Sequence, residues 1–253
     1  MVEIENNKLY NGEYLKVVSE IQTESIDCIV SDPPYGVGFK EAEYIDDKDF
    51  VLNEMPKWYK EWFRVLKPNG FMFLFVGVRN LHQWIQKGID TGFTYKNIIA
   101  TRSFNNGSIR GSSNFGFQFQ PVLVFSKGNG HKLNEIDFIP TSDCWEKDKR
   151  NKNPKPYTYD YPNWIKTEWA FATAKRANKS YHPNEKNVDL IRFLIEVATN
   201  RDEIVFDSFM GSGSTGVACA KADRKFVGIE LNKEYFNIAY DRIYNATRQL
   251  KLF

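Results

Sequence analysis

The stretch that decides the fold is IDCIVSDPPYG, residues Ile26–Gly36. Its first five residues are mostly apolar and β-branched, and they predict a buried strand. Asp32 follows at the carboxyl end of this strand, where open α/β sheets bind their ligands. Pro33 and Pro34 fix φ and remove two backbone donors, so they predict a stiff corner. The corner carries a carboxylate, the Pro33 carbonyl and the Tyr35 ring, which together can grip an exocyclic amino group and stack on the ring that bears it.

Outward from this stretch, predicted strands and amphipathic helices alternate along the chain. Apolar runs predict strands at residues 26–30, 71–76, 95–101, 122–125, 204–206 and 225–229. Apolar residues at helical spacing predict helices at 14–21, 52–66, 81–91, 188–198 and 233–250. This alternation predicts an α/β fold with a doubly wound, mostly parallel sheet. Residues 36–50 read as a loop, and residues 102–119 and 127–181 break the pattern.

Composition sets wide limits on the class of protein. The chain has 253 residues, which allows one large α/β domain with an insert, and its 42% apolar and 26% charged residues are typical of a soluble globular protein. A net charge of +2 allows a local basic face without requiring nucleic acid. Cys28, Cys144 and Cys219 lie far apart, so neither a disulfide framework nor a zinc site is indicated. Without a signal-peptide core or a membrane-length apolar run, we expect a cytoplasmic protein.

A second constellation is DSFMGSGSTG, residues Asp207–Gly216. Its glycines let the backbone approach a ligand, and the helix that follows offers free amides. The spacing also fits a dinucleotide-binding GxGxxG, but four residues separate the strand from the glycines and put a carboxylate where a pyrophosphate would lie. A carboxylate there suits a cationic amino-acid ligand instead. Glu230 ends the next predicted strand and can accept two hydrogen bonds from ribose hydroxyls.

Both constellations resemble those of one enzyme family. Asp-Pro-Pro-Tyr at 32–35 resembles the catalytic motif of DNA amino-methyltransferases, which methylate adenine N6 or cytosine N4. The pattern Asp-x-Phe-x-Gly-x-Gly at 207–213 resembles the S-adenosylmethionine (AdoMet) loop of the same enzymes. HPNEK at 182–186 resembles the family segment His-Pro-x-x-Lys, which lies against the methionine end of the cofactor. Ser208 and Asn187 stand where the family commonly has proline.

The resemblance implies a set of functional residues. Asp32, Pro33, Pro34 and Tyr35 are the implied catalytic residues. The implied cofactor-binding residues are Asp207, Phe209, Gly211, Gly213, Ser214, Thr215, Glu230, Lys186, His182 and Glu13. For His182, a capping or packing role ahead of a helix is the alternative. No metal is implied.

The order of the motifs predicts the topology. The proline corner precedes the glycine loop, which resembles the β group of these enzymes, a circular permutation of the seven-stranded, Rossmann-like AdoMet-methyltransferase fold. The sheet then needs a further strand after Glu230, and Leu9–Glu13 can supply it, with Glu13 near the cofactor's adenine. We expect residues 1–128 to form the catalytic half of this domain, 129–181 a target-recognition insert, and 182–253 the AdoMet-binding half.

The implied activity is transfer of a methyl group from AdoMet to adenine N6 in double-stranded DNA, on a flipped-out base. Cytosine N4 is the nearest alternative, followed by an RNA or protein-glutamine N-methyltransferase and by a binding module with an inactive site. No Pro-Cys pair occurs in the chain, which argues against cytosine C5. A cognate restriction endonuclease and a second copy of the chain are candidate partners, and the sequence leaves both open. We expect no membrane partner.

Overall fold

The computed structural model describes residues 1–36, 40–41, 44–45, 47–102, 109–110, 114–115, 119–135, 164–166 and 185–249. The helices are α1 (Tyr14–Val17), α2 (Lys48–Val65), α3 (Leu81–Thr91), α5 (Val188–Ala198), α6 (Ser214–Lys221) and α7 (Lys233–Gln249), with 3₁₀ turns η1 (Val18–Glu20) and η2 (Val78–Asn80). The strands are β1 (Val2–Ile4), β2 (Asn7–Asn11), β3 (Ile26–Ser31), β4 (Lys40–Glu41), β5 (Tyr44–Ile45), β6 (Leu66–Phe75), β7 (Thr94–Arg102), β8 (Ile109–Arg110), β9 (Asn114–Phe115), β10 (Phe119–Ser126), β11 (Trp164–Lys166), β12 (Ile204–Asp207) and β13 (Lys225–Glu230).

One sheet organises these elements, with strand order β1-β2-β13-β12-β3-β6-β10-β7-β11. Strands β2, β13, β12, β3 and β6 run parallel, and β10 is antiparallel to both of its neighbours. The predicted count of seven strands is not confirmed, because the sheet has nine among the described residues. The run from β2 to β7 accounts for seven of them, and β1 and β11 add one edge strand at each end.

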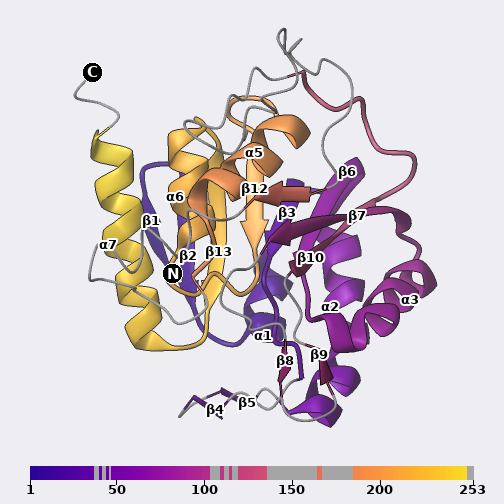
Figure 1. The fold of residues 1–253 in the computed structure, drawn as a ribbon. Coiled ribbons are helices and arrows are strands. Elements are labelled where there is room, and N and C mark those ends of the chain that lie inside the picture. The colour runs from indigo at the N-terminus through magenta and orange to yellow at the C-terminus, as the bar shows by residue number, and fades with distance from the viewer. Residues whose placement is uncertain are drawn as a thin grey trace, which may run out of the picture.

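Helices cover both faces of the sheet (Figure 1). Alternate residues of β6 point to opposite faces. Phe71, Phe73 and Phe75 pack in one core with α5, α6 and α7. Met72 and Leu74 pack in a second core with α1, α2 and α3. A strand buried on both faces must be apolar throughout, which is the pattern that predicted it. The α/β, doubly wound architecture is therefore confirmed.

The N-terminal strand joins the sheet beside the last strand of the chain. β2 pairs in parallel with β13, and Asn11 lies opposite Glu230. This is the pairing that the permuted order requires, although the permutation itself stays an interpretation. The loop predicted for residues 36–50 ends earlier than expected, because Asp47 accepts hydrogen bonds from the amides of Asp49 and Phe50 and starts α2 at Lys48.

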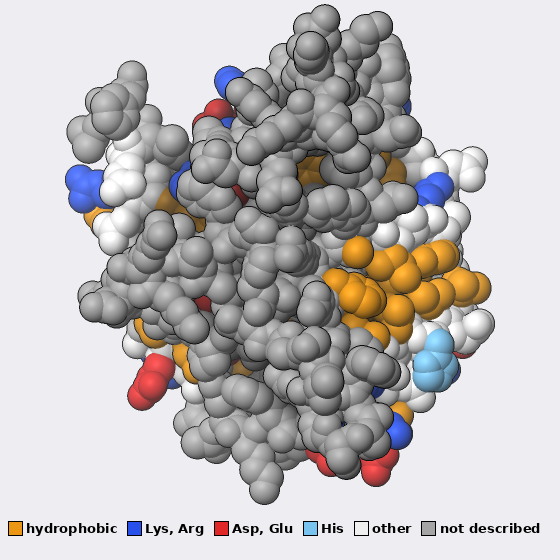
Figure 2. All heavy atoms as spheres, viewed as in Figure 1, with side chains coloured by type: hydrophobic (Ala, Val, Ile, Leu, Met, Phe, Trp, Pro, Cys, Tyr) orange, Lys and Arg blue, Asp and Glu red, His pale blue; other side chains and the backbone are white. Residues whose placement is uncertain are grey.

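One side of the molecule carries surface hydrophobic side chains. Hydrophobic side chains gather at the surface on the side of the molecule where β7 and α3 lie (Figure 2). A second copy of the chain stays a candidate partner. Within the described residues, no helix combines the length and the apolar character needed to cross a membrane.

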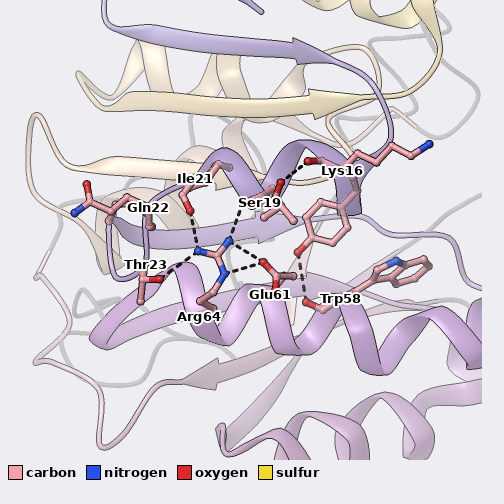
Figure 3. Close-up of polar contacts among 11 residues, drawn as sticks. Lys16, Ser19, Ile21, Gln22, Thr23, Trp58, Glu61 and Arg64 are labelled. Atoms are coloured by element: carbon pink, nitrogen blue, oxygen red, sulfur yellow. Dashed lines mark hydrogen bonds and ion pairs between the residues drawn. The ribbon is translucent and has the colours of Figure 1, made fainter.

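Arg64 on α2 fastens the segment that leads into β3 (Figure 3). Its guanidinium donates to the carbonyl oxygens of Val18 and Ile21, each at 2.8 Å, and pairs with Glu61 one turn earlier. The Val18 carbonyl also accepts from the Ile21 amide at 3.0 Å within the 3₁₀ turn, and Ile21 lies just after that turn. The arginine thereby sets how α1 and η1 approach the sheet before the chain enters β3.

We therefore expect Arg64→Met to lower the free energy of unfolding by about 1–3 kcal/mol, because two backbone acceptors lose a charged donor. Lys57→Met is the matched control, since Lys57 lies on the same helix and pairs with Glu54 at the same spacing, but is 60% exposed. Its effect should stay within about 0.5 kcal/mol. Urea unfolding measures both variants, and equal losses would contradict this role for Arg64.

Candidate functional site

The two sequence constellations meet at the centre of the sheet. β3 and β12 are neighbours, with Phe206 opposite Ile29. From β3 the chain continues through α2 to β6 on one side, and from β12 it continues through α6 to β13 on the other. Strand order therefore reverses between them, which in open α/β sheets opens a crevice at the carboxyl ends. Asp32 and Asp207 lie at those ends.

A buried chain of hydrogen bonds joins the two ends. Ser31 Oγ donates to Asp207 Oδ1 at 2.9 Å. Ser31 has one hydroxyl hydrogen, so Ser208 must be the donor in the 3.0 Å contact between the two serine hydroxyls. Trp62 Nε1 of α2 in turn donates to Ser208 Oγ at 2.9 Å. A proline at 208 would break this chain, which explains the departure from the family pattern.

Asp207 is held inside the protein. It is 3% exposed, and it accepts further hydrogen bonds from Thr215 Oγ1 at 2.6 Å and from the Phe209 amide at 3.1 Å. Its carboxylate thus fixes both the start of the glycine loop and the first turn of α6. Direct contact of Asp207 with a ligand, as the resemblance implies, stays a prediction.

Burial raises the pKa of two carboxyls at this edge. The pKa of Asp207 rises to about 6, against the opposing effect of its hydrogen bonds from Thr215, Phe209 and Ser31. The pKa of Glu230 rises to about 7, also chiefly through burial and against its backbone hydrogen bonds. Both carboxyls are therefore harder to ionise than usual, and a cationic ligand beside them would favour their charged forms.

The glycine loop makes a tight turn into α6. Gly213 has φ of +84° and touches α7 so closely that an added Cβ would lie 2.9 Å from the Ala239 Cα. Gly211 has φ of +51°, but an added Cβ there would have no atom of the described residues within 4 Å. The next residue after Gly213, Ser214, is buried, and its Oγ has no hydrogen-bond partner among the described residues. The loop therefore offers open space at Gly211 and a hydroxyl able to take a new partner, both of which fit a ligand.

Glu230 closes the loop from the neighbouring strand. Its Oε2 accepts from the Gly211 amide at 2.9 Å, and its Oε1 accepts from the Asn232 amide at 2.8 Å. A carboxylate has about four acceptor positions, so a ribose hydroxyl could still bind here, and the expected ribose contact stays a prediction. Glu13 lies just before α1, is half exposed and pairs with Lys16 at 2.7 Å. Its expected contact with adenine also stays a prediction.

The proline corner is rigid and partly buried. Pro33 and Pro34 are buried, whereas Asp32 and Tyr35 are half-buried. Tyr35 OH donates to Asp32 Oδ1 and accepts from Gln120 Nε2 at 2.5 Å. The Tyr35 carbonyl accepts from Asn80 Nδ2 at 3.1 Å, which anchors the corner to η2.

Lys186 reaches the proline corner. Its Nζ lies 2.5 Å from Asp32 Oδ2, and the two side chains are 16% and 23% exposed. The residue before it, Glu185, pairs at 2.5 Å with Arg242 of α7, which also donates to the Ser212 carbonyl at 2.7 Å. Arg242 thus ties the glycine loop to the segment that carries Lys186. Asn187 then caps α5 by accepting from the amides of Asp189 and Leu190, a role that a proline at 187 could not perform.

Phe209 and His182 are the remaining predicted cofactor-binding residues. Phe209 packs against Trp58 and Tyr14, with ring centroids 5.1 and 5.3 Å apart, and its contact with a ligand stays a prediction. His182 lies outside the described residues.

Sequence reasoning missed Ser31, Trp62, Gln120 and Arg242. Ser31 did carry a signal, because it is a polar residue that directly follows the apolar run of residues 28–30. Arg242 did as well, because it is a cation next to the inward positions Ala239 and Ile243 of α7. Trp62 and Gln120 carried none, since only the packing of α2 and β10 brings them to the site.

Comparison with known proteins is consistent with this geometry. The family model N6_N4_Mtase, described as DNA methylase, matches residues 26–241. The chain is 27% identical over 249 residues to the DNA adenine methyltransferase YhdJ of Escherichia coli K12, covering 94% of this chain and 83% of that protein. It is also 27% identical to the type II methyltransferase M.HpaI of Haemophilus parainfluenzae, covering 94% and 74%.

Solved structures share the fold. The PvuII DNA methyltransferase, described as cytosine-N4-specific, superposes with a TM-score of 0.68 at 20% identity, covering 97% of this chain and 93% of that one. A putative DNA modification methylase of Thermus thermophilus, solved with S-adenosyl-L-methionine, gives a TM-score of 0.66 at 20% identity, with 95% and 96% covered.

The two glycines give a matched test of the loop. Gly213→Ala should lower the free energy of unfolding by about 2–4 kcal/mol, because the left-handed φ and the contact with α7 both oppose a Cβ. Gly211→Ala should lower it by about 1–2 kcal/mol, because φ alone opposes the change. Urea unfolding at neutral pH compares them, and a Gly211→Ala loss as large as that of Gly213→Ala would contradict this geometry.

The buried carboxyl predicts how stability depends on pH. Because the folded pKa of Asp207 lies above the unfolded value, the folded state binds more protons between about pH 4 and 6, and stability falls as pH rises through that window. Asp207 alone should account for roughly 3 kcal/mol. The raised pKa of Glu230 likewise makes stability fall as pH rises, up to about pH 7.

Asp207→Asn should reduce the fall of stability with rising pH, whatever its effect on the free energy of unfolding at any one pH. Asp241→Asn, on the exposed face of α7, is the control for loss of one carboxyl. Unfolding free energies measured at half-unit steps from pH 4 to 7 give the slopes. A slope that Asp207→Asn leaves unchanged would rule out Asp207 as the titrating group.

Proposed function

The chain belongs to the N6_N4_Mtase family of DNA methylases, and from this premise we propose that it transfers a methyl group from AdoMet to N6 of adenine in double-stranded DNA. The observation that carries the proposal is the 2.9 Å hydrogen bond from Ser31 to Asp207. It brings the strand end that presents Asp32 against the start of the glycine loop. A methyl donor held by the loop and a base held at the proline corner would then face one another.

The glycine loop suits AdoMet. Open space at Gly211 and the Ser214 hydroxyl, which has no partner among the described residues, offer a polar cradle beside the amino end of α6, where a carboxylate is stabilised. The carboxylates of Asp207 and Glu230 favour a ligand that carries positive charge. When bound, AdoMet would supply an electrophilic methyl group on a sulfonium sulfur that leaves as a neutral thioether. We propose that Gly211, Gly213, Ser214, Thr215, Phe209 and Glu230 hold it, with Lys186, Glu13 and His182 at its two ends.

The proline corner suits a planar amino group. The amino nitrogen of adenine is a poor nucleophile, because its lone pair is delocalised into the ring. The Asp32 carboxylate and the Pro33 carbonyl would accept its two N–H hydrogens and draw it towards sp³ geometry. As the nitrogen gains the methyl group it becomes positive, and Asp32 stabilises that charge and is the first acceptor for the proton that leaves. Positioning by Pro33, Pro34 and the stacked ring of Tyr35 contributes the rest.

A paired base hides its amino group, so the proposal requires the target base to be flipped out of the duplex, at a cost of a few kcal/mol. We propose that residues 129–181 recognise the DNA as an insert between the two halves of the methyltransferase domain, 1–128 and 182–253. Both halves contribute strands to one sheet, and β11 within 129–181 adds an edge strand to it. A cognate endonuclease and a second copy of the chain are partners that this role would accommodate.

Cytosine N4 is the alternative target. It presents the same kind of amino group, and a structure with this fold is described as cytosine-N4-specific. The aspartate ahead of Pro-Pro-Tyr favours adenine, because the family tends to carry Asp or Asn for adenine and Ser for cytosine. The E. coli relative is described as an adenine enzyme, which points the same way.

The experiment is to incubate purified protein with AdoMet and unmethylated bacterial DNA, sequence the product for modified positions, and digest it to nucleosides for mass analysis. We expect N6-methyladenine in one sequence context. N4-methylcytosine would replace the proposal with its alternative, and AdoMet binding without any methylated base would indicate a binding module.

Asp32→Ala should reduce methyl transfer by about 10²–10³-fold with the fold retained, because it removes an acceptor for a nitrogen that becomes positive. Asp90→Ala on α3 is the control, as an exposed carboxylate distant from the corner. Single-turnover rates with labelled AdoMet measure both variants. Activity of Asp32→Ala close to that of the wild type would exclude the proposed mechanism.

A further inference from the structure

The ion pair between Lys186 and Asp32 conflicts with the role proposed for Asp32. The Lys186 ammonium, 2.5 Å from Asp32 Oδ2, and the Tyr35 hydroxyl on Oδ1 compete with the amino group of the base for this carboxylate. The ammonium also places a positive charge beside a nitrogen that must become positive, which raises the energy of that state. A second anionic partner for Lys186 would remove both of the obstacles that its ammonium presents.

The described residues indicate where that partner lies. Lys186 is 16% exposed, so a phosphate on the outside of the duplex is poorly placed to reach it. Its neighbour Glu185 is bound to Arg242, which holds the Ser212 carbonyl and hydroxyl at 2.7 and 2.8 Å. The segment that carries Lys186 is thus fastened to the glycine loop, on the cofactor's side of the crevice.

We propose that Lys186 is shared between two carboxylates: it pairs with Asp32 in the absence of cofactor and moves to the amino-acid carboxylate of the cofactor when the glycine loop is filled. This inference rests on the proposed function and adds a regulatory step to it. Cofactor binding releases Asp32, so the base engages fully only after the methyl donor is in place. The arrangement makes the two substrates cooperate through one side chain.

The proposal has an unusual consequence for binding. Part of the affinity for the cofactor is offset by breaking the Lys186–Asp32 pair, so removing the charge of Asp32 should tighten binding. S-adenosylhomocysteine (AdoHcy) is the appropriate probe, because it has the amino-acid carboxylate but no sulfonium charge that Asp32 could attract directly. We expect Asp32→Asn to lower the AdoHcy dissociation constant at least threefold.

The remaining variants complete a thermodynamic cycle, measured by calorimetry on the full chain. Lys186→Gln should raise the dissociation constant about tenfold or more, and Asp32→Asn should give no tightening in that background. Lys186→Arg should retain most of the affinity. Lys221→Gln, at the exposed end of α6, is the control and should have no effect. With 5′-deoxy-5′-(3-aminopropylthio)adenosine, which is AdoHcy without its carboxylate, all of these differences should shrink to within twofold.

Three results would overturn the proposal. Asp32→Asn could leave AdoHcy binding unchanged or weaken it, which would exclude competition between Asp32 and the cofactor carboxylate for Lys186. This result does not depend on whether the Lys186 variants fold. Lys186→Gln could weaken both ligands equally, which indicates a structural role. Lys186→Gln could also leave AdoHcy binding unchanged while lowering the salt dependence of DNA binding, which assigns the ammonium to a phosphate.

The proposed function fails separately, if the wild-type protein neither binds AdoHcy nor methylates DNA. If the wild type does both and the Asp32→Asn result is absent, only the sharing of Lys186 is wrong.

Discussion

The structure depends on the burial of one carboxylate. Asp207 is almost fully removed from water at the end of β12, and a buried carboxylate is tolerated only when its oxygens accept hydrogen bonds. Ser31, Thr215 and the Phe209 amide supply them. These three donors come from β3, from α6 and from the glycine loop, so satisfying one charge fixes three elements relative to one another. The meeting of the β3 and β12 ends at the centre of the sheet is a direct result.

The same edge of the sheet gathers charges of both signs. Asp32, Asp207 and Glu230 come from the ends of three adjacent strands, and their mutual repulsion adds to the cost of burial. Lys186 pairs with Asp32, Arg242 contacts the glycine loop at Ser212, and both cations are largely buried. Their positive charges offset part of that repulsion. The charges at this edge therefore come from residues far apart in the chain, and changing one of them alters the electrostatic energy of the others.

Sequence reasoning predicted those elements whose determinants are local. Helices α3 and α5 begin and end at the predicted residues, because Gly92 adopts the left-handed conformation after α3 and Asn187 caps the start of α5. The continuous apolar run of β6 likewise predicted a strand buried on both faces of the sheet. Identification of Asp32 and Asp207 at neighbouring strand ends followed from the motifs and their position after strands.

Features that depend on distant pairing were not predictable in the same way. The antiparallel direction of β10 leaves no trace in its apolar run, since a strand buried on both faces reads alike in either direction. The edge strand β11 is three residues long and lies in a stretch without periodicity. The ion pair of Lys186 with Asp32 joins residues that the motif alone assigned to different tasks. Each of these depends on contacts made across the fold, which no local pattern encodes.

The parallel pairing of β2 with β13 affects how the polypeptide is made. Asn11 leaves the ribosome early, yet the backbone carbonyl that its side chain binds belongs to Glu230, 219 positions later. During translation β2 must wait, with one edge unpaired, until nearly all of the sheet has been synthesised. Pairing between strands so distant in sequence is slow, and it leaves an unpaired, aggregation-prone strand edge exposed in nascent chains. The preceding strand β1 folds back on β2 as a local antiparallel partner and can shield its other edge during that interval.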